Sequence, residues 1–367
     1  MTDQITKDAA YNAVAPDDFK SMIEVDRYND RSTHFDKIIT ATHDHFWDPL
    51  DEKYIDFNEP FDIENEMILP IELVPELQTE IADKLTDKQK IAFANENARW
   101  MLSAILHGEQ GAMSLSASLC HILRDPGAQE YASNQAREEA RHVLGFSRYI
   151  QSRWGTPLTC GQTLADLLEE MVNAPQVYKK LVGMQMLVEG LAMGAFATLF
   201  NHAKDPLLVK LTQLVMTDEA FHHKFGKIWA DKTIPHLDTK EHEIIEDWAA
   251  KCFQTLLFNL INPEQKKEIY GQFGLDWEWC MEVMVKAATD EVRREHMQES
   301  TDIFRVLIKT LLNAGIITDR TKPFYAMYVD MDELAKEGDE MVGDAIAEEG
   351  IKFLQTINFS EKAAAAE

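Results

Sequence analysis

Apolar positions repeat at helical spacing from about residue 86 onward, and no segment shows a strong strand pattern. Long helices are expected near 88–124, 127–154, 175–203 and 205–232. A shorter helix at 162–172 would fill the crossover between the second and third. Asp125-Pro126 and Asp205-Pro206 separate the helices of each pair, because an aspartate can cap a helix that begins with proline. The pattern predicts an all-α protein.

The flanking segments differ in pattern from this central part. Residues 1–70 carry four prolines without a helical period, which predicts an arm that wraps over the main body. A short helix is expected from Val74 to Leu85. Further helices are expected near 240–262, 264–272, 276–315 and 332–356, before a frayed tail. The expected division is an N-terminal arm, a bundle, additional helices packed on it and a tail, at 1–87, 88–232, 233–358 and 359–367.

The chain contains two copies of Glu-x-x-His, formed by Glu139 with His142 and by Glu219 with His222. Residues three apart share one face of a helix, so each pair can present a carboxylate and an imidazole to one point. Of the 12 histidines, only these two have a glutamate three residues earlier. The motif alone is a weak signal, and its meaning depends on the residues around it.

Two further glutamates give the motif its specificity. Glu109 precedes Glu139 by 30 residues, and Glu189 precedes Glu219 by the same number. Each lies in the middle of a long apolar stretch, on the helical face that carries the apolar side chains. A buried carboxylate must be protonated, paired or bound to metal. Two divalent cations would balance the four negative charges of these glutamates.

In identity, order and spacing these residues resemble the ligands of ferritin-like diiron and dimanganese carboxylate proteins, over about residues 95–230. The resemblance implies a ferritin-like four-helix bundle that holds two metal ions through Glu109, Glu139, His142, Glu189, Glu219 and His222, with the four glutamates also acting in catalysis. Carboxylates with imidazole suit iron or manganese. Two irons are expected, with manganese or a mixed Mn/Fe pair as the alternative.

The resemblance also implies an outer layer around the ligands. An acid directly precedes each motif glutamate, and in similar proteins such an acid accepts the N–H of a ligand histidine on the opposing helix. Asp218 is therefore expected to pair with His142, and Glu138 with His222. The inward helix faces predict an apolar substrate cavity lined by Met113, Met186, Met193 and Phe196.

Three classes within this superfamily remain open, and the chain departs from each. The small subunit of ribonucleotide reductase usually carries its radical tyrosine one turn after the first ligand histidine, where this chain has Phe146. Arylamine N-oxygenases carry an additional histidine where Val215 stands. Acyl desaturases and multicomponent hydroxylases have a threonine where Ala192 and Met193 stand.

The expectation common to these classes is an oxygen-activating diiron oxidase or monooxygenase acting on a small, largely apolar organic substrate. An arylamine N-oxygenase-like enzyme, an acyl desaturase-like enzyme and a radical or iron-binding protein are the alternatives. Iron storage is disfavoured, because ferritins are much shorter than this chain of 367 residues. Dioxygen and an electron-donor protein are the expected partners, and the chain could form a homodimer.

Composition narrows the partners further. A formal net charge of −27 disfavours nucleic acid, anionic membranes and polyanionic substrates. The four cysteines include no CxxC pair, so neither a disulfide framework nor a cysteine zinc site is expected. No apolar signal core or run of 18 apolar residues occurs, which predicts a cytoplasmic protein. The segment Thr42-His43-Asp44-His45, which could suggest a metal site, is interpreted as solvated surface.

Overall fold

The computed structural model describes residues 13–364 apart from 44, 262, 288–302 and 339–342. Within this part of the chain the regular structure is helical, apart from one isolated bridge between Ala13 and Leu123. The all-α prediction is therefore confirmed.

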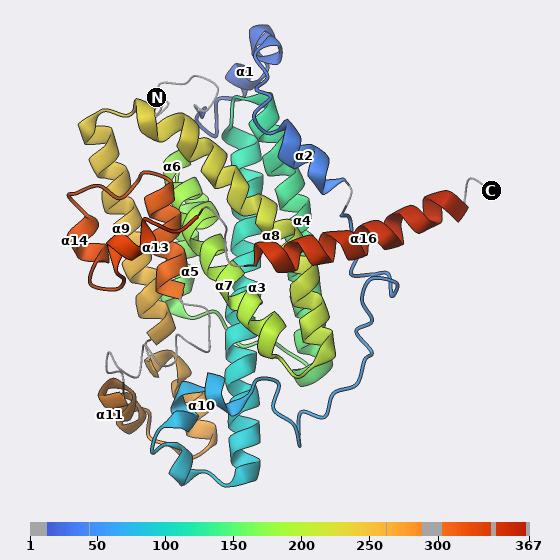
Figure 1. The fold of residues 1–367 in the computed structure, drawn as a ribbon, viewed down its shortest axis with the longest axis vertical. Helices are drawn as coiled ribbons and strands as arrows, with labels where there is room; N and C mark the ends of the chain where they lie inside the picture. Colours follow the sequence, from blue (N-terminus) through green and yellow to red (C-terminus); the bar gives the residue numbers. More distant parts are fainter. Residues whose placement is uncertain (1–12, 44, 262, 288–302, 339–342, 365–367) are drawn as a thin grey trace.

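Four long helices form the centre of the molecule: α3 (Asp87–Ile122), α4 (Pro126–Trp154), α7 (Glu189–His202) and α8 (Pro206–Thr233) (Figure 1). Helix α3 packs along α4, α7 packs along α8, and α4 also contacts α8. This is the ferritin-like four-helix arrangement expected from the sequence.

The starts of these helices follow from side-chain capping. Thr86 and Gln89 form a capping box at α3. The Asp125 side chain accepts hydrogen bonds from two backbone N–H groups at the start of α4, and Asp205 accepts one at the start of α8. Each aspartate precedes the proline that opens its helix, as the sequence predicts.

The third bundle helix contains an irregular part that the sequence pattern does not predict. Helix α6 (Val177–Lys180) continues into the π-helical element η6 (Leu181–Val188), which leads directly into α7. The whole segment Val177–His202 is long and apolar enough to cross a membrane, but 72% of its most apolar window is buried inside the protein. It is the central core helix of the fold.

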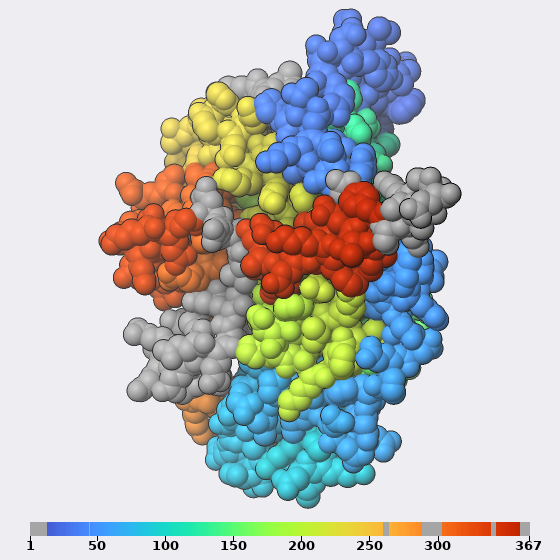
Figure 2. Space-filling model, turned by 45° about the vertical axis from the view of Figure 1, so that its right-hand side comes forward, coloured from blue at the N-terminus to red at the C-terminus, as the bar shows by residue number. Residues whose placement is uncertain are grey.

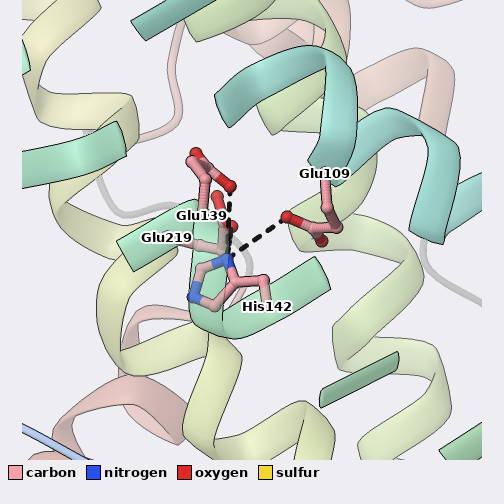
Figure 3. Close-up of side chains that lie close together, drawn as sticks. All are labelled: Glu109, Glu139, His142 and Glu219. Carbon is pink, nitrogen blue, oxygen red and sulfur yellow. Dashed lines mark hydrogen bonds and ion pairs between the residues drawn. The ribbon is translucent and has the colours of Figure 1, made fainter. Parts of the chain in front are cut away.

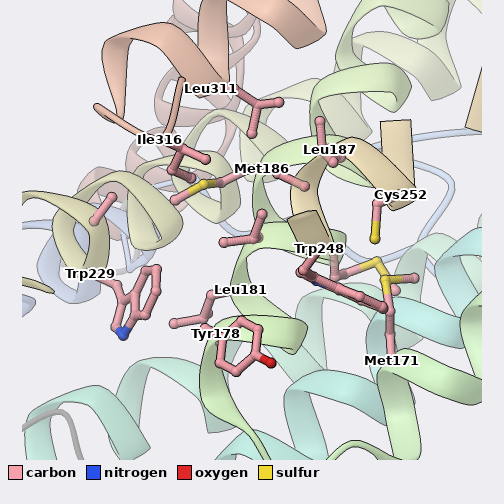
Figure 4. Packing of buried hydrophobic residues seen from close by; sticks show 14 of the residues in the cluster. Met171, Tyr178, Leu181, Met186, Leu187, Trp229, Trp248, Cys252, Leu311 and Ile316 are labelled. Carbon is pink, nitrogen blue, oxygen red and sulfur yellow. The ribbon is translucent and has the colours of Figure 1, made fainter. Parts of the chain in front are cut away.

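The apolar residues of η6 pack against the outer helices (Figure 4). These are α5 (Gln162–Asn173), which fills the crossover, α9 (Thr239–Ile261) and α13 (Ile303–Asn313). The backbone of η6 lies close to α5 and α9 at Gly183. A Cβ at this position would stand 2.5 Å from Met171 Sδ and 3.4 Å from the Trp248 ring. This packing holds the segment that carries Glu189 against the bundle.

The remaining elements cover the bundle from outside. The arm contains α1 (Phe19–Met22), η2 (Val25–Asn29) and α2 (Asp36–Thr42), and α2 contacts α4 and α8. Helix α16 (Asp344–Ala364) crosses α8 on the face shown in Figure 2. Shorter helices complete the fold: η7 (Ile234–His236), η8 (Pro263–Lys266), α10 (Lys267–Gln272), α11 (Trp277–Ala287), α14 (Lys322–Tyr325) and α15 (Met331–Leu334).

The helix predicted from Val74 to Leu85 is wrong. The segment instead forms short 3-10 turns, η3 (Ile71–Leu73), η4 (Pro75–Gln78) and η5 (Ala82–Lys84). Thr79 is extended, and its hydroxyl donates to the Glu76 carbonyl while accepting from the Ile81 N–H. These local bonds replace those of a continuous helix.

Two predictions near the C-terminus also differ from the structure. The helix predicted over 332–356 is wrong, since α15 ends at Leu334 and α16 begins only at Asp344, after Gly343 with a φ of 93°. Of the predicted tail, 359–364 are part of helix α16, as the alanine residues favour, and 365–367 lie outside the described residues. Of the helix predicted over 276–315, the described parts are α11 and α13, and 288–302 lie outside the described residues.

Candidate metal centre

The four bundle helices bring the six predicted ligands together. Glu109 lies in the middle of α3, Glu189 is the first residue of α7, and the two Glu-x-x-His motifs lie on α4 and α8. All six are buried in the core of the bundle. Their potential ligand atoms form two groups, within each of which all atoms lie within 4.8 Å of one another. The groups are Glu109, Glu139, His142 and Glu219, and Glu139, Glu189, Glu219 and His222.

His142 points one ring nitrogen at three carboxylates (Figure 3), and His222 points one at two. His142 Nδ1 lies 3.2 Å from Glu109 Oε2, 3.3 Å from Glu139 Oε2 and 3.1 Å from Glu219 Oε1. His222 Nδ1 lies 3.0 Å from Glu139 Oε1 and 3.3 Å from Glu219 Oε2. Glu139 and Glu219 therefore contact both histidines and lie between the two groups.

The side chains fit a pair of divalent cations. Among the described residues, Glu139 Oε2, both carboxylate oxygens of Glu219 and His222 Nδ1 are buried without a hydrogen-bond partner. Buried polar atoms normally have such a partner, so these atoms point to a missing charge at the centre of the cluster. Carboxylate oxygen with imidazole nitrogen is a donor set that suits iron and manganese. Two such ions would bind the orphaned atoms and balance the four carboxylates.

Without metal, the cluster holds protons. Burial, together with the neighbouring carboxylates, raises the pKa values of Glu109 and Glu189 well above the usual range. Burial opposes the charged form of both histidines, but hydrogen bonds and ion pairs to surrounding carboxylates outweigh it and raise their pKa values. Metal ions would displace these protons, because metal ligands must be deprotonated.

A second layer of acids orients the histidines. Asp218 Oδ2 lies 2.9 Å from His142 Nε2, and Glu138 Oε2 lies 2.9 Å from His222 Nε2. These are the pairings expected from the sequence. A proton on Nε2 is donated to the acid, which leaves Nδ1 free to bind a metal. Arg141 donates to both oxygens of Asp218, at 2.6 and 3.0 Å, and neutralises its charge.

The arm adds two residues that sequence reasoning missed. Trp47 Nε1 donates to Asp218 Oδ2 at 2.9 Å, and its ring stacks on that of His142. His45 is buried, with Nε2 3.4 Å from Asp218 Oδ1, so the solvated-surface interpretation is wrong for His45. His43 is exposed, and Asp44 lies outside the described residues. The arm has no periodic pattern of apolar residues from which the positions of Trp47 and His45 could have been predicted.

His45 also belongs to a third group of possible ligand atoms, with Glu138 and Asp218. The Arg141 guanidinium already contacts both acids, at 3.6 Å from Glu138 Oε1 and 2.6 Å from Asp218 Oδ1. The positive charge of the guanidinium therefore already balances the two acids that a metal ion would bind. We therefore assign the third group to the support of the histidines and not to metal.

Two buried amides also contact the cluster: Gln185, which the sequence places on the inward face around Glu189, and Gln135, which sequence reasoning missed. Gln135 Nε2 donates to Glu139 Oε1 at 3.0 Å and lies 3.2 Å from Gln185 Oε1 and 3.4 Å from Glu189 Oε1. Both glutamines are fully buried. Each lies four residues before a ligand glutamate, a spacing that could have identified them as neighbours of the site.

An apolar cavity of about 320 Å³ lies against the cluster. Glu109 and Glu189 form part of its wall, and side chains of α3, α5, α7, α9 and α13 form most of the rest. Gly108 lines it too, and no atom lies within 4 Å of where a Cβ at Gly108 would stand. The wall also includes Glu72 of the arm, which is exposed to solvent.

The four side chains predicted to line the substrate cavity lie elsewhere. Met186 and Met193 line a second cavity, of about 230 Å³, with His223 and Lys224. Phe196 is fully buried and stacks on Phe146, and Met113 is half-buried on α3. The described wall of the larger cavity includes none of the four. The apolar character expected of the cavity is present, but Ile105, Ala192 and Leu199 are among the residues that provide it.

The sequence matches no protein-family model and no curated protein. Three solved structures are similar to it, all R2-like ligand-binding oxidases, each 15% identical, with the match covering 74% of this chain and 94% of that chain. One has an aerobically reconstituted metal cofactor after photoconversion, with a TM-score of 0.45. Two are mutants reconstituted with Mn/Fe cofactors, with TM-scores of 0.40 and 0.39. The assignment of the metal centre rests on the contacts within this chain.

Proposed function

We propose that the protein is a dioxygen-dependent oxidase or monooxygenase with a dimetal centre, acting on a small, largely apolar organic molecule. The observation that carries this proposal is the contact between the cluster and the 320 Å³ cavity, whose wall includes Glu109 and Glu189. A metal store needs no such cavity, whereas an enzyme must bring its substrate to the metal ligands. Two irons are the preferred ions, with a mixed Mn/Fe pair as the alternative.

Different residues of the chain would bind the metal ions, orient the histidine rings and position the substrate. The chemistry that two bound irons supply is the reductive activation of dioxygen. Glu139 and Glu219 would hold both ions, because each contacts both histidines. Asp218 and Glu138 fix the histidine rings. The apolar wall would exclude water and position the substrate beside Glu109 and Glu189.

The reaction needs external electrons when one oxygen atom is inserted into a C–H or N–H bond. Dioxygen, the substrate, two electrons and two protons then give the oxygenated product and one water. An electron-donor protein is the proposed source of the electrons. We keep the cytoplasmic location and the homodimer as expectations from the sequence.

The test is anaerobic loading with Fe(II), followed by dioxygen, a reductant and a panel of apolar candidates. Oxygen uptake and organic products would be measured together, the latter by mass spectrometry. We expect the consumption of dioxygen to be proportional to the formation of one organic product. Ala192→Trp, which fills the cavity, should keep the metal and lose substrate-dependent uptake. Oxidation of the iron without any organic product would favour the iron-binding or radical alternative.

A further inference from the structure

Asn259 on α9 belongs to the wall of the same cavity and carries an unpaired polar atom. The side chain is only 8% exposed, and it belongs to the cavity wall. Its Oδ1 is buried and has no hydrogen-bond partner in the part of the chain that the structure describes. A buried acceptor without a partner is costly, and such atoms in native proteins call for an explanation.

The position of Asn259 is well defined by its surroundings. Leu256, one turn earlier on α9, is buried and lines the cavity as well, so this face of the helix is turned toward the cavity. The backbone carbonyl of Asn259 accepts a hydrogen bond from Gln265 Nε2 at 2.9 Å. The C-terminal end of α9 is therefore held in place while Oδ1 of the side chain remains unpaired.

The other polar groups of the wall have different roles. Glu109 and Glu189 belong to the metal cluster. The Thr198 hydroxyl already donates to the Gly194 carbonyl at 3.0 Å, as is common within helices. Glu72 is exposed to solvent. Asn259 Oδ1 is thus a buried, unpaired acceptor on a residue of the cavity wall.

We propose that Asn259 Oδ1 accepts a hydrogen bond from the substrate. The substrate would be an apolar molecule that carries an uncharged O–H or N–H donor. A carboxylate is disfavoured, because it has no hydrogen to donate and would place a negative charge against the acceptor Oδ1. The donor would be bound by α9, and the reacting part of the molecule would lie against α3 and α7. This inference rests on the proposed function, in that the cavity is taken as the substrate site.

The test compares four ligands with the metal-loaded protein in the absence of reductant. They are a medium-chain 1-alkanol, its methyl ether, the alkane of equal length and the corresponding alkanoate. Trp100 lines the cavity, so its fluorescence reports binding without any turnover. We expect the alkanol to bind about tenfold more tightly than the ether, which keeps the oxygen but has lost the donor. The alkanoate should bind more weakly than the alkanol.

Asn259→Leu should abolish the preference for the alkanol over the ether and leave alkane binding equal or tighter. Thr198→Val is the matched control on the same wall and should keep the preference. Trp100→Phe should abolish the fluorescence change on binding, which shows that the change comes from Trp100. Thermal unfolding shows whether each variant is folded. The wild-type comparison of alkanol with ether stands even if Asn259→Leu does not fold.

Equal affinity for alkanol and ether in the wild type, or a preference that survives in Asn259→Leu, would overturn the inference. The outcome is separable from that of the proposed function. If alkanols bind in an Asn259-dependent manner but oxygen uptake never follows, the oxidase proposal fails and the donor site stands. If turnover occurs without dependence on Asn259, the donor site fails and the oxidase proposal stands.

Discussion

Glu139 and Glu219 differ from the other ligands in that each belongs to both groups of ligand atoms. Replacing either by alanine should remove a ligand of both metals and lower the metal content by more than about half. Elemental analysis after purification from iron-supplemented medium measures this. Glu130→Ala is a suitable control. Glu130 lies on α4, as Glu139 does, but its side chain is exposed and pairs with Arg31. A variant of Glu139 or Glu219 that retained two metals per chain would contradict the assignment.

Phe146 occupies the position one turn after His142, is fully buried and stacks on Phe196. We expect no stable tyrosyl radical there after the reduced protein meets oxygen, and electron paramagnetic resonance measures this. Tyr149 donates to Asp205 at 2.8 Å, whereas the hydroxyl of buried Tyr131 has no partner among the described residues. A strong tyrosyl signal would contradict the prediction, and Tyr131→Phe and Tyr149→Phe would then locate it.

At the scale of elements, the bundle could be predicted from the sequence because its helices are periodic and because α3, α4 and α8 begin at side-chain caps. The i, i+3 spacing placed each Glu-x-x-His pair on one helix face, and the equal 30-residue intervals matched Glu109 and Glu189 to the two motifs on the following helices. The contacts of His45 and Trp47 could not be predicted, because they depend on how the arm crosses the bundle. The π-helical hydrogen bonds of η6 leave no mark in the pattern of apolar residues either.

The π-helical element matters because it carries Gln185 to Gln135, which in turn contacts Glu139 and Glu189. Gln135→Leu should remove the N–H donor that Gln135 directs at these carboxylates and weaken metal binding about 10- to 100-fold. A competition titration with a chelator measures the affinity. Gln151→Leu replaces an exposed glutamine on the same helix and should have no effect. Unchanged affinity in the Gln135 variant would show that the amide has no positioning role.

Lys180 is the last residue of α6, and its side chain is buried against the C-terminal end of α5. Its ammonium donates to Ser118 Oγ at 2.7 Å and to the carbonyls of Met171 and Val172. Burial lowers the pKa of Lys180 to about 8 from an ordinary 10.5. Between these two pH values the unfolded chain binds a proton at this position that the folded chain has lost. The contribution of Lys180 to the free energy of unfolding should therefore rise with pH across this window.

Urea unfolding at several pH values between about 7 and 10.5, compared with Lys180→Met, measures this contribution. The stability difference between wild type and variant should grow in favour of the wild type as pH rises above about 8. Lys240→Met, at an exposed position, should show a difference that does not depend on pH. A flat difference for Lys180→Met would mean that its ammonium is not destabilised by burial.

At the scale of the whole molecule, the arm and α16 cover the bundle from outside. The arm supplies Trp47 and His45 to Asp218, and α16 crosses the outer face of α8 (Figure 2). The cluster thus places four glutamates in the core of a chain that already has a net charge of −27. Self-repulsion and desolvation both act against such a core unless positive charge enters it.

Loading with metal should therefore stabilise the whole fold. A ligand present at about 100 times its Kd contributes about 2.7 kcal/mol to the free energy of unfolding, which corresponds to several degrees in Tm for a chain of this size. Scanning calorimetry of chelator-treated protein, before and after Fe(II) is added without oxygen, measures the shift. Glu139→Ala and Glu219→Ala should lose most of it, and Glu130→Ala should keep it. An equal rise in Tm for all four proteins would mean that iron stabilises the chain from outside the cluster.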